Sequence, residues 1–426
     1  MARLDPLRAL RYNPAHVKLG GVLAPPYDVI SPGQRDDLYG RDLRNIVRID
    51  FGVAYPEDVA GASDRYTRAA AHLAAWLRLD ILVRDPAPAF YATTHEFIHP
   101  DGSVRRRRGL FGRALALPWD RSELRPHERT LRAPKEDRLA LLRATGVQTS
   151  PVFVVADGAA SLDHIIDETT AADPLFGGRT DGELGSEKHL LWRIDDPRRL
   201  TAIMSALQNA SLYVADGHHR YETAVAYAAE RRATTPDALP DADFAQCLLH
   251  VVDRADPALT ILPTHRLVHP GHGVAFSLDD LWARLDDAFD EDAVDDVSQA
   301  MQRIGELHAT HHAYAVVAHG GVAVLRRDRR TTGSPRQRLD AVVLEDEVLA
   351  PAGVDRSAIE AGALAYTRNP GDLASAVRRG DAVLGFGLNP VTVDEVIAVA
   401  GSGETMPQKS TYFYPKVPTG LVMSPL

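Results

Sequence analysis

A strand, a polar corner and a helix are predicted in one run at the middle of the chain, LYVADGHHRYETAVAYAA at residues 212–229. Its apolar start, residues 212–215, is typical of a short buried strand, and the following Asp216 and Gly217 are typical of a turn. Apolar positions then recur every three or four residues, at Tyr221, Ala224, Val225 and Ala228. That spacing places them on one face of a helix, so the run predicts a strand–corner–helix unit.

The corner of this unit is suited to an anion. The first turn of a helix has unpaired backbone N–H groups and a partial positive charge, and His218, His219 and Arg220 stand directly after the turn. Phosphate is the ligand that such a corner favours. A structural alternative makes Asp216 only a helix cap and Gly217 only a turn residue. That alternative leaves the three basic side chains unexplained, because the helix dipole disfavours cations at this end.

Composition narrows the class of protein. The 426 residues are enough for two or three lobes, or for one elaborated domain. The 48 Lys and Arg against 58 Asp and Glu give a net charge of −10, which argues against binding nucleic acid over a broad basic face. The single Cys247 excludes an intrachain disulfide framework and cysteine clusters as zinc ligands. No apolar run approaches the length of a membrane span, so we expect a cytoplasmic protein.

Periodicity elsewhere predicts a mixed α/β fold. Residues 45–51 alternate as a half-buried strand does, and residues 58–79 have the pattern of an alanine-rich helix. Toward the C-terminus, strand and helix patterns alternate, which favours an α/β layer. We expect a core domain at 1–270, a small acidic lobe of helices and a hairpin at 271–335, and a C-terminal α/β segment at 336–426.

The sequence HEFIH at residues 95–99 matches the HExxH pattern of zinc proteases, which requires a helix. Its context instead predicts a β-hairpin, because a PDGS turn at residues 100–103 separates it from a second strand-like run. On a strand, residues four apart lie about 13 Å from each other, too far to share one ion. We therefore expect no zinc there, and we interpret the four arginines at residues 105–108 as an exposed strand edge.

Polar loops provide further candidate site residues. Asp28 follows two adjacent prolines, which hold a rigid loop in an extended path, and Glu128 stands in a polar loop between two elements. Lys409 and Ser410 lie in a segment rich in glycine and hydroxyl groups, without the GxxxxGK[ST] spacing of a Walker motif. The structural alternatives are a turn carboxylate for Asp28, a solvated loop for Glu128 and an exposed lysine beside a strand for Lys409.

Several runs together resemble the bacterial family called domain of unknown function 1015. The runs are APPYDVIS at 24–31, PHERT and PKEDRLALLRAT within 126–145, ADGHHRYETA at 215–224, ILPTHRLV at 261–268 and GETMPQKSTYFYPKVPTGLV at 403–422. The resemblance spans the chain nearly end to end. The family name implies no reaction.

The corner at residues 216–220 is also similar to the G-x-H-R or D-G-H-x-R corner of the ParB and sulfiredoxin-like superfamily, which includes archaeal kinases of free serine. In those relatives the corner opens a helix and holds nucleotide phosphates. The resemblance implies the same role here, in a ParB/sulfiredoxin-like nucleotide-binding core elaborated with β-hairpins and a C-terminal α/β lobe. This chain has a second histidine and is far longer, so the serine specificity does not carry over.

The leading hypothesis is an ATP- or ADP-dependent small-molecule kinase or related phosphotransferase. Nucleotide phosphates would be bound by Asp216, Gly217, His218, His219, Arg220, Lys409 and Ser410. His218 and Arg220 would also neutralise charge on the transferred group, and Asp28 or Glu128 would deprotonate an acceptor hydroxyl. The distant resemblance suggests free serine or a similar hydroxyl metabolite as the acceptor.

The expected cofactors are ATP or ADP and Mg²⁺, with the ion held mainly by nucleotide oxygens and water. This hypothesis assigns no metal ligand to the protein. We expect a small-molecule substrate and no nucleic-acid or membrane partner, and we leave a homodimer open. Two alternatives are a non-catalytic nucleotide-binding regulatory protein and a metal-dependent hydrolase that uses His218, His219 and neighbouring carboxylates.

Overall fold

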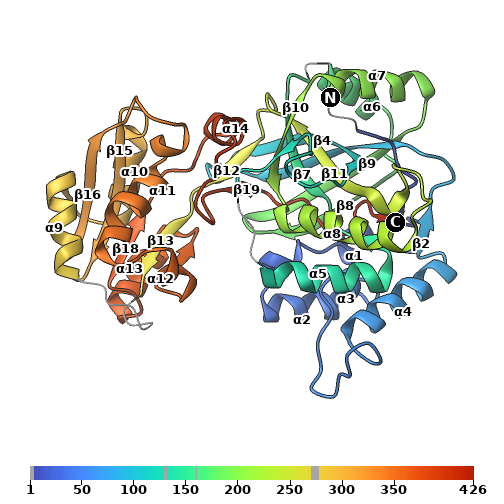
Figure 1. Cartoon of the computed structure of the whole chain (residues 1–426), viewed down its shortest axis with the longest axis horizontal. Coiled ribbons are helices and arrows are strands. Elements are labelled where there is room, and N and C mark those ends of the chain that lie inside the picture. The colour runs from blue at the N-terminus through green and yellow to red at the C-terminus, as the bar shows by residue number, and fades with distance from the viewer. Residues whose placement is uncertain (1–3, 129–131, 160, 270–277) are drawn as a thin grey trace. The chain divides into compact units, whose positions relative to one another are not determined.

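The computed structural model describes residues 4–128, 132–159, 161–269 and 278–426 (Figure 1). They form two compact units. Unit 1 comprises Met1–Pro126, Thr130–Leu259 and Pro415–Leu426, and unit 2 comprises His127–Arg129 and Thr260–Tyr414. The predicted acidic lobe and most of the predicted C-terminal segment therefore share unit 2. The predicted boundary at residue 270 lies outside the described residues.

An eight-stranded mixed sheet organises unit 1, in the order β5-β10-β7-β11-β4-β3-β9-β8. Its strands are β3 (Phe90–Ile98), β4 (Val104–Leu115), β5 (Leu124–Arg125), β7 (Val152–Asp157), β8 (Phe176–Gly182), β9 (Gly185–Ile194), β10 (Ser211–Asp216) and β11 (Gln246–Asp253). The pairs β5·β10 and β7·β11 are parallel, whereas β10 runs antiparallel to β7. The predicted central strand is confirmed as β10.

The described residues of unit 1 also form α-helices. They are α1 (Leu19–Val22), α2 (Pro32–Arg41), α3 (Val47–Asp50), α4 (Arg65–Arg78), α5 (Arg132–Thr145), α6 (Leu162–Thr170), α7 (Pro197–Gln208) and α8 (His218–Thr234). The predicted central helix is confirmed as α8, and its Tyr221, Ala224 and Ala228 lie in the core with residues of β7, β10 and β11. Figure 1 shows α8 beside α5, and the two helices are in contact. Two short strand pairs complete the unit: β1 (Leu10–Tyr12) with β2 (Leu82–Arg84), and β6 (Val147–Gln148) with β20 (Ser424–Pro425).

Unit 2 is built on a six-stranded antiparallel sheet in the order β14-β16-β15-β18-β13-β17. Its strands are β13 (His265–Val268), β14 (Asp290–Val294), β15 (His311–Ala318), β16 (Gly321–Asp328), β17 (Leu364–Thr367) and β18 (Leu384–Gly387), and a separate pair joins β12 (Thr260–Leu262) to β19 (Tyr412–Tyr414). Its α-helices are α9 (Leu278–Ala288), α10 (Val297–Leu307), α11 (Asp340–Leu344), α12 (Arg356–Glu360), α13 (Pro370–Arg379) and α14 (Val393–Gly401).

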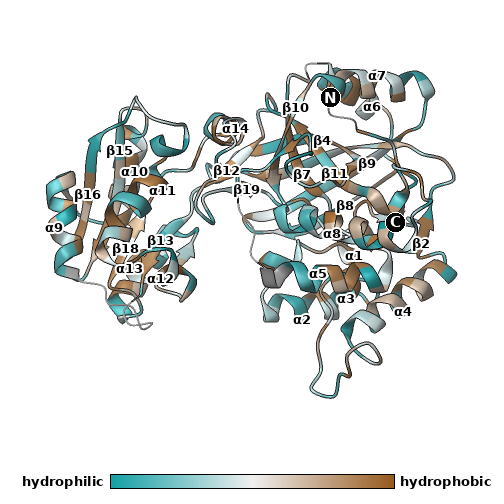
Figure 2. Ribbon diagram, viewed as in Figure 1, coloured by the Kyte–Doolittle hydropathy of each residue, from teal (hydrophilic) through white to brown (hydrophobic). Residues whose placement is uncertain are grey.

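The apolar pattern explains both cores. Every residue of β11 is buried, and the described buried side chains of α9 (for example Leu281 and Leu285) face the unit 2 core. Figure 2 shows hydrophilic residues on α9, where Asp286 and Asp287 are exposed as predicted for a solvated acidic face. In the part of the chain that the structure describes, no helix combines the length and apolar character that a membrane span requires.

The strand predicted at residues 45–51 is wrong, because this segment contains the single helical turn α3. Asn45 determines the turn: its Oδ1 accepts a hydrogen bond from the backbone N–H of Val47 at 3.0 Å, and its Nδ2 donates to two backbone carbonyls. Ile46, Val47, Ile49 and Asp50 are all buried. A run of seven residues is too short for its apolar positions to distinguish the two periods.

The exposed arginine edge predicted at residues 105–108 is also wrong. This part of β4 pairs with β3, and side chains alternate between the two faces of the sheet. Arg107 is only 1% exposed and donates to the carbonyl oxygen of Pro415 at 2.8 Å. Arg108 forms ion pairs with Asp163 and Asp167. The hairpin itself, β3 with β4, is confirmed.

Candidate functional site

The corner between β10 and α8 depends on a glycine. Gly217 is the N-cap of α8 and has φ 91°, in the left-handed region that side chains rarely adopt. A Cβ added there would approach the Arg220 guanidinium to 3.0 Å. Because glycine has no side chain, it cannot supply the side-chain cap that often covers the amides of a first turn. The predicted helix start is therefore confirmed at His218.

Arg220 is bound within the corner. Its guanidinium ion-pairs with Asp216, four residues earlier, and it also donates to Ser150 Oγ at 2.8 Å and to the carbonyl oxygen of Pro151. Only 11% of the Arg220 side chain is exposed. The sequence predicted that Arg220 would contact a ligand and that Asp216 would form part of the binding surface. The structure instead pairs the two, because a buried guanidinium needs a carboxylate and acceptors around it.

Lys416 provides a second cation at the same carboxylate. Its Nζ pairs with Asp216 Oδ1, while Arg220 pairs with Oδ2. Burial alone would raise the pKa of Asp216, but Lys416 and Arg220 outweigh it and hold that pKa well below its usual range. Two cations against one carboxylate leave one positive charge in this triad. The sequence reasoning chose Lys409 and missed Lys416, although Lys416 stands in the same family-like run.

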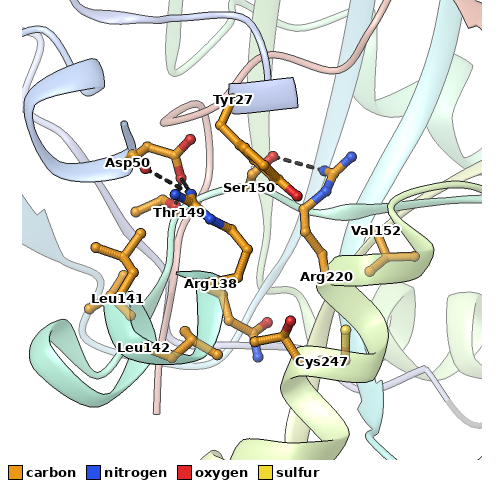
Figure 3. Close-up of a pocket in the computed structure, with 13 residues that line it drawn as sticks. Tyr27, Asp50, Arg138, Leu141, Leu142, Thr149, Ser150, Val152, Arg220 and Cys247 are labelled. Atoms are coloured by element: carbon orange, nitrogen blue, oxygen red, sulfur yellow. Dashed lines mark hydrogen bonds and ion pairs between the residues drawn. The ribbon is translucent and has the colours of Figure 1, made fainter. Parts of the chain in front are cut away.

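Tyr27 and Asp28 lie at this corner too. The rigid loop predicted for them is a 3₁₀ turn, Tyr27–Val29, which begins after Pro26. Asp28 is exposed. Burial lowers the pKa of Arg220, but the negative charge of Asp216, followed by that of Asp28, raises it. Burial raises the pKa of Tyr27 to about 12, and the guanidinium of Arg138 stacks 4.1 Å from the centroid of its ring. Figure 3 shows Tyr27 between Arg138 and Arg220.

A small cavity lies beneath Tyr27 and Arg220 (Figure 3). Its polar lining includes Asp50, Arg138 and Ser150, and its apolar lining is Leu141, Leu142, Val147, Val152 and Cys247. The centre of a water molecule can occupy about 40 Å³ of it, which is room for very few waters. A nucleotide would not fit there, so any nucleotide at the corner must bind from the solvent side.

The two histidines of the corner differ in burial. His218 is 6% exposed and its ring centroid lies 6.4 Å from that of Trp119, whereas His219 is half-buried. Among the described residues, the group of three metal-ligating side chains within 4.8 Å of one another lies elsewhere in unit 1 and contains neither histidine. The hydrolase alternative built on His218 and His219 is therefore not supported by the geometry.

Glu128 belongs to unit 2. Its backbone forms a parallel bridge with Met406, whose N–H donates to the carbonyl oxygen of His127 at 2.8 Å. The ring of His127 is 1% exposed, and its Nε2 lies 2.9 Å from Thr411 Oγ1. The loop at 126–128 and the segment at 406–411, which are far apart in the sequence, are thus neighbours within this unit.

Lys409 and Ser410 lie in that segment of unit 2. Lys409 is exposed and has φ 57°, an uncommon backbone conformation for a residue with a side chain. Ser410 is 5% exposed and donates from Oγ to the carbonyl oxygen of Pro407 at 2.8 Å. The structure therefore groups Asp28 with residues 216–220 in unit 1, and Glu128, Lys409 and Ser410 in unit 2.

The fold and the corner define a mixed α/β protein with a charged strand–corner–helix site. The chain belongs to the family described as Protein of unknown function (DUF1015), whose model matches residues 4–342. No curated protein matches the chain.

Solved structures give low similarities. A conserved hypothetical protein from Pyrococcus furiosus has 13% identity and a TM-score of 0.35, covering 74% of this chain and 95% of its own. A free serine kinase in complex with AMP has 13% identity and a TM-score of 0.37, covering 73% and 92%. SbnI from Staphylococcus aureus, with a C-terminal truncation, has 12% identity and a TM-score of 0.36, covering 73% and 87%.

Proposed function

We propose that the β10–α8 corner of unit 1 binds the phosphates of ATP or ADP, and that the protein is a small-molecule kinase or phosphotransferase. One observation carries the proposal: Asp216 is held between Lys416 and Arg220 at a helix start whose N-cap residue is Gly217. The surplus positive charge of this triad and the helix dipole both favour an oxyanion at the same place.

The contacts suggest a different role for each cation. Arg220 is fixed by Asp216, Ser150 and Pro151, so it shapes the corner and contributes its charge without leaving these partners. Lys416 pairs with the same carboxylate as Arg220, and its ammonium stands on a flexible stem that can direct it toward a phosphate. His218 would add a hydrogen bond or charge to the transferred group.

Asp28 is the stronger candidate for the base that deprotonates an acceptor hydroxyl. It is exposed and lies close enough to act electrostatically on Arg220, so a substrate bound at the corner could reach it. Mg²⁺ would be held mainly by nucleotide oxygens and water. Glu128 as an alternative base, and Lys409 and Ser410 as phosphate contacts, remain predictions. The acceptor that we propose to test first is free serine.

Two measurements test this function. Calorimetric titration of the full chain with ATP, ADP and AMP, with and without Mg²⁺, tests binding. Incubation with ATP, ADP or pyrophosphate, Mg²⁺ and a panel of hydroxyl metabolites including serine, followed by mass spectrometry, tests turnover. We expect nucleotide binding and one phosphorylated product. Binding that is absent for all three nucleotides contradicts the site, and binding without any product contradicts the kinase.

The second candidate is a nucleotide-binding regulatory protein that uses the same corner without catalysis, which the pairing of Arg220 with Asp216, Ser150 and Pro151 favours because it fixes the corner in one geometry. It predicts nucleotide binding that survives Asp28→Asn and Glu128→Gln, with no product from the wild-type chain. A cytoplasmic location is part of the main proposal, which cell fractionation tests. A homodimer is left open, and light scattering decides it.

A further inference from the structure

His95, the first histidine of the HExxH sequence, lies in the middle of β3, where no helical zinc motif can form. The second histidine, His99, stands at the hairpin turn, and its Nδ1 pairs with Asp101 at 2.9 Å. The prediction that these two histidines do not share an ion agrees with their places on an extended chain. That prediction did not address the contacts of His95 with the neighbouring strand.

Across the sheet, His95 is the direct partner of His189 on β9. Glu187 lies two residues before His189, so both side chains project from the same face of the strand. His95 Nε2 lies 2.7 Å from Glu187 Oε2, and His189 Nε2 lies 3.8 Å from the same oxygen. The two imidazole rings have centroids 4.2 Å apart. Three metal-ligating groups thus converge, with their ligand atoms within 4.8 Å of one another.

All three side chains of this cluster are buried. His95 is 6%, Glu187 8% and His189 1% exposed. Two nitrogens and a carboxylate suit a transition metal, whereas Mg²⁺ and Ca²⁺ prefer oxygen ligands alone.

We propose that His95, Glu187 and His189 form a binding site for a divalent transition metal, with Zn²⁺ as the most suitable ion. Zinc bonds of about 2.0–2.2 Å in a tetrahedral site hold ligand atoms roughly 3.3–3.6 Å apart. The distances of 2.7 and 3.8 Å lie on either side of this range, so these two pairs of atoms reach it by sub-ångström movements of their side chains. Thr180 Oγ1, 2.8 Å from His189 Nε2, or a water completes the fourth position.

Arg107 is the cation nearest to this cluster, and it limits the affinity. Its Nη2 lies 3.4 Å from His95 Nδ1, which is long for a hydrogen bond, and it donates instead to the carbonyl oxygen of Pro415 at 2.8 Å. Without metal, Asp256 and Glu187 balance its charge, and Glu187 hydrogen-bonds to His95. Metal binding releases to solvent the proton shared by His95 Nε2 and Glu187, and two bonds to the ion replace that hydrogen bond. The site joins β3 to β9, so occupancy should stabilise unit 1.

The experiment uses the full chain without a histidine tag, stripped with a chelator. Titration with Co²⁺ should give the visible bands of four-coordinate cobalt, saturating at one equivalent, and Zn²⁺ should displace them and raise the melting temperature. His95→Ala and His189→Ala should weaken Zn²⁺ binding by more than the roughly 10- to 100-fold that loss of an outer-shell partner costs. Glu187→Gln, which conserves volume, provides the same test if the alanine variants do not fold.

The matched control is His99→Ala, which removes the other histidine of the HExxH sequence and should leave Co²⁺ and Zn²⁺ binding unchanged. Wild-type protein that shows no saturable cobalt spectrum overturns the proposal. So does binding that survives in Glu187→Gln and His95→Ala, or that is lost in His99→Ala. Because the readout is the metal alone, failure of the kinase proposal does not affect this result.

Discussion

Lys416 pairs with Asp216, a residue 200 positions earlier in the chain. This contact attaches the segment Pro415–Leu426, which belongs to unit 1, to the corner at which β10 becomes α8. Asp216 therefore receives one cation from its own helix and one from the end of the chain. The triad of Asp216, Lys416 and Arg220 therefore has one surplus positive charge, which leads to the first prediction.

Lys416→Ala should weaken ATP or ADP binding about 10-fold, equivalent to about 1.4 kcal/mol. The variant removes the surplus charge and leaves Asp216 neutralised by Arg220 alone. The control is Lys188→Ala, which removes the same charge from β9, separated from β10 by four strands of the sheet. Calorimetry on both variants measures the effect. Equal affinities for the two variants would exclude Lys416 from the site.

Asp28→Asn should lower kcat by roughly 100- to 10,000-fold, because the amide cannot accept the proton of the acceptor hydroxyl. Nucleotide affinity should stay close to the wild-type value, since Asp28 lies at the corner without pairing Arg220 directly. Asp36→Asn, at an exposed position of α2, is the control. Unchanged kcat in Asp28→Asn would contradict the role of Asp28 as the base.

Arg138→Met should destabilise unit 1 by about 3–5 kcal/mol. Arg138 is 6% exposed and pairs with Asp137 and with Asp50, so its loss leaves both carboxylates with fewer partners and Tyr27 without its stacked guanidinium. Arg143→Ala, which breaks an exposed ion pair with Glu230, should cost less than about 1 kcal/mol. Urea denaturation compares the two, and similar losses would contradict the buried role of Arg138.

Asp216→Asn should change how stability depends on pH. The pKa of Asp216 is lowered in the folded protein by Lys416 and Arg220 against the opposing effect of burial. Its charged form therefore contributes stability above the unfolded pKa of about 3.9, and this contribution is lost as the pH falls toward the lower folded pKa. The unfolding free energies of wild type and variant should differ most above about pH 5 and converge in acid. Urea midpoints from pH 2.5 to 7 test this, and a constant difference contradicts it.

The sequence by itself determined the local elements of the site. The apolar run at 212–215, the Asp216–Gly217 turn and the apolar spacing from Tyr221 onward were sufficient to predict β10, the corner and α8, because each depends on neighbouring residues. The same holds for the hairpin of β3 and β4, which a turn at residues 100–103 specifies. Seven residues at 45–51 were too few, and the hydrogen bonds of Asn45 decided a helical turn there.

Only the tertiary structure decided which charges meet. Arg220 was identified from sequence, and its partner Asp216 stands only four residues earlier. Its bond to Ser150 instead depends on how α8 packs beside the segment before β7. Two further contacts join residues that are far apart in the sequence. Lys416 pairs with Asp216, 200 positions away, and His95 hydrogen-bonds to Glu187, 92 positions away. Strand pairing and burial determine these contacts, which form only when distant segments fold together. A local sequence pattern therefore cannot predict them.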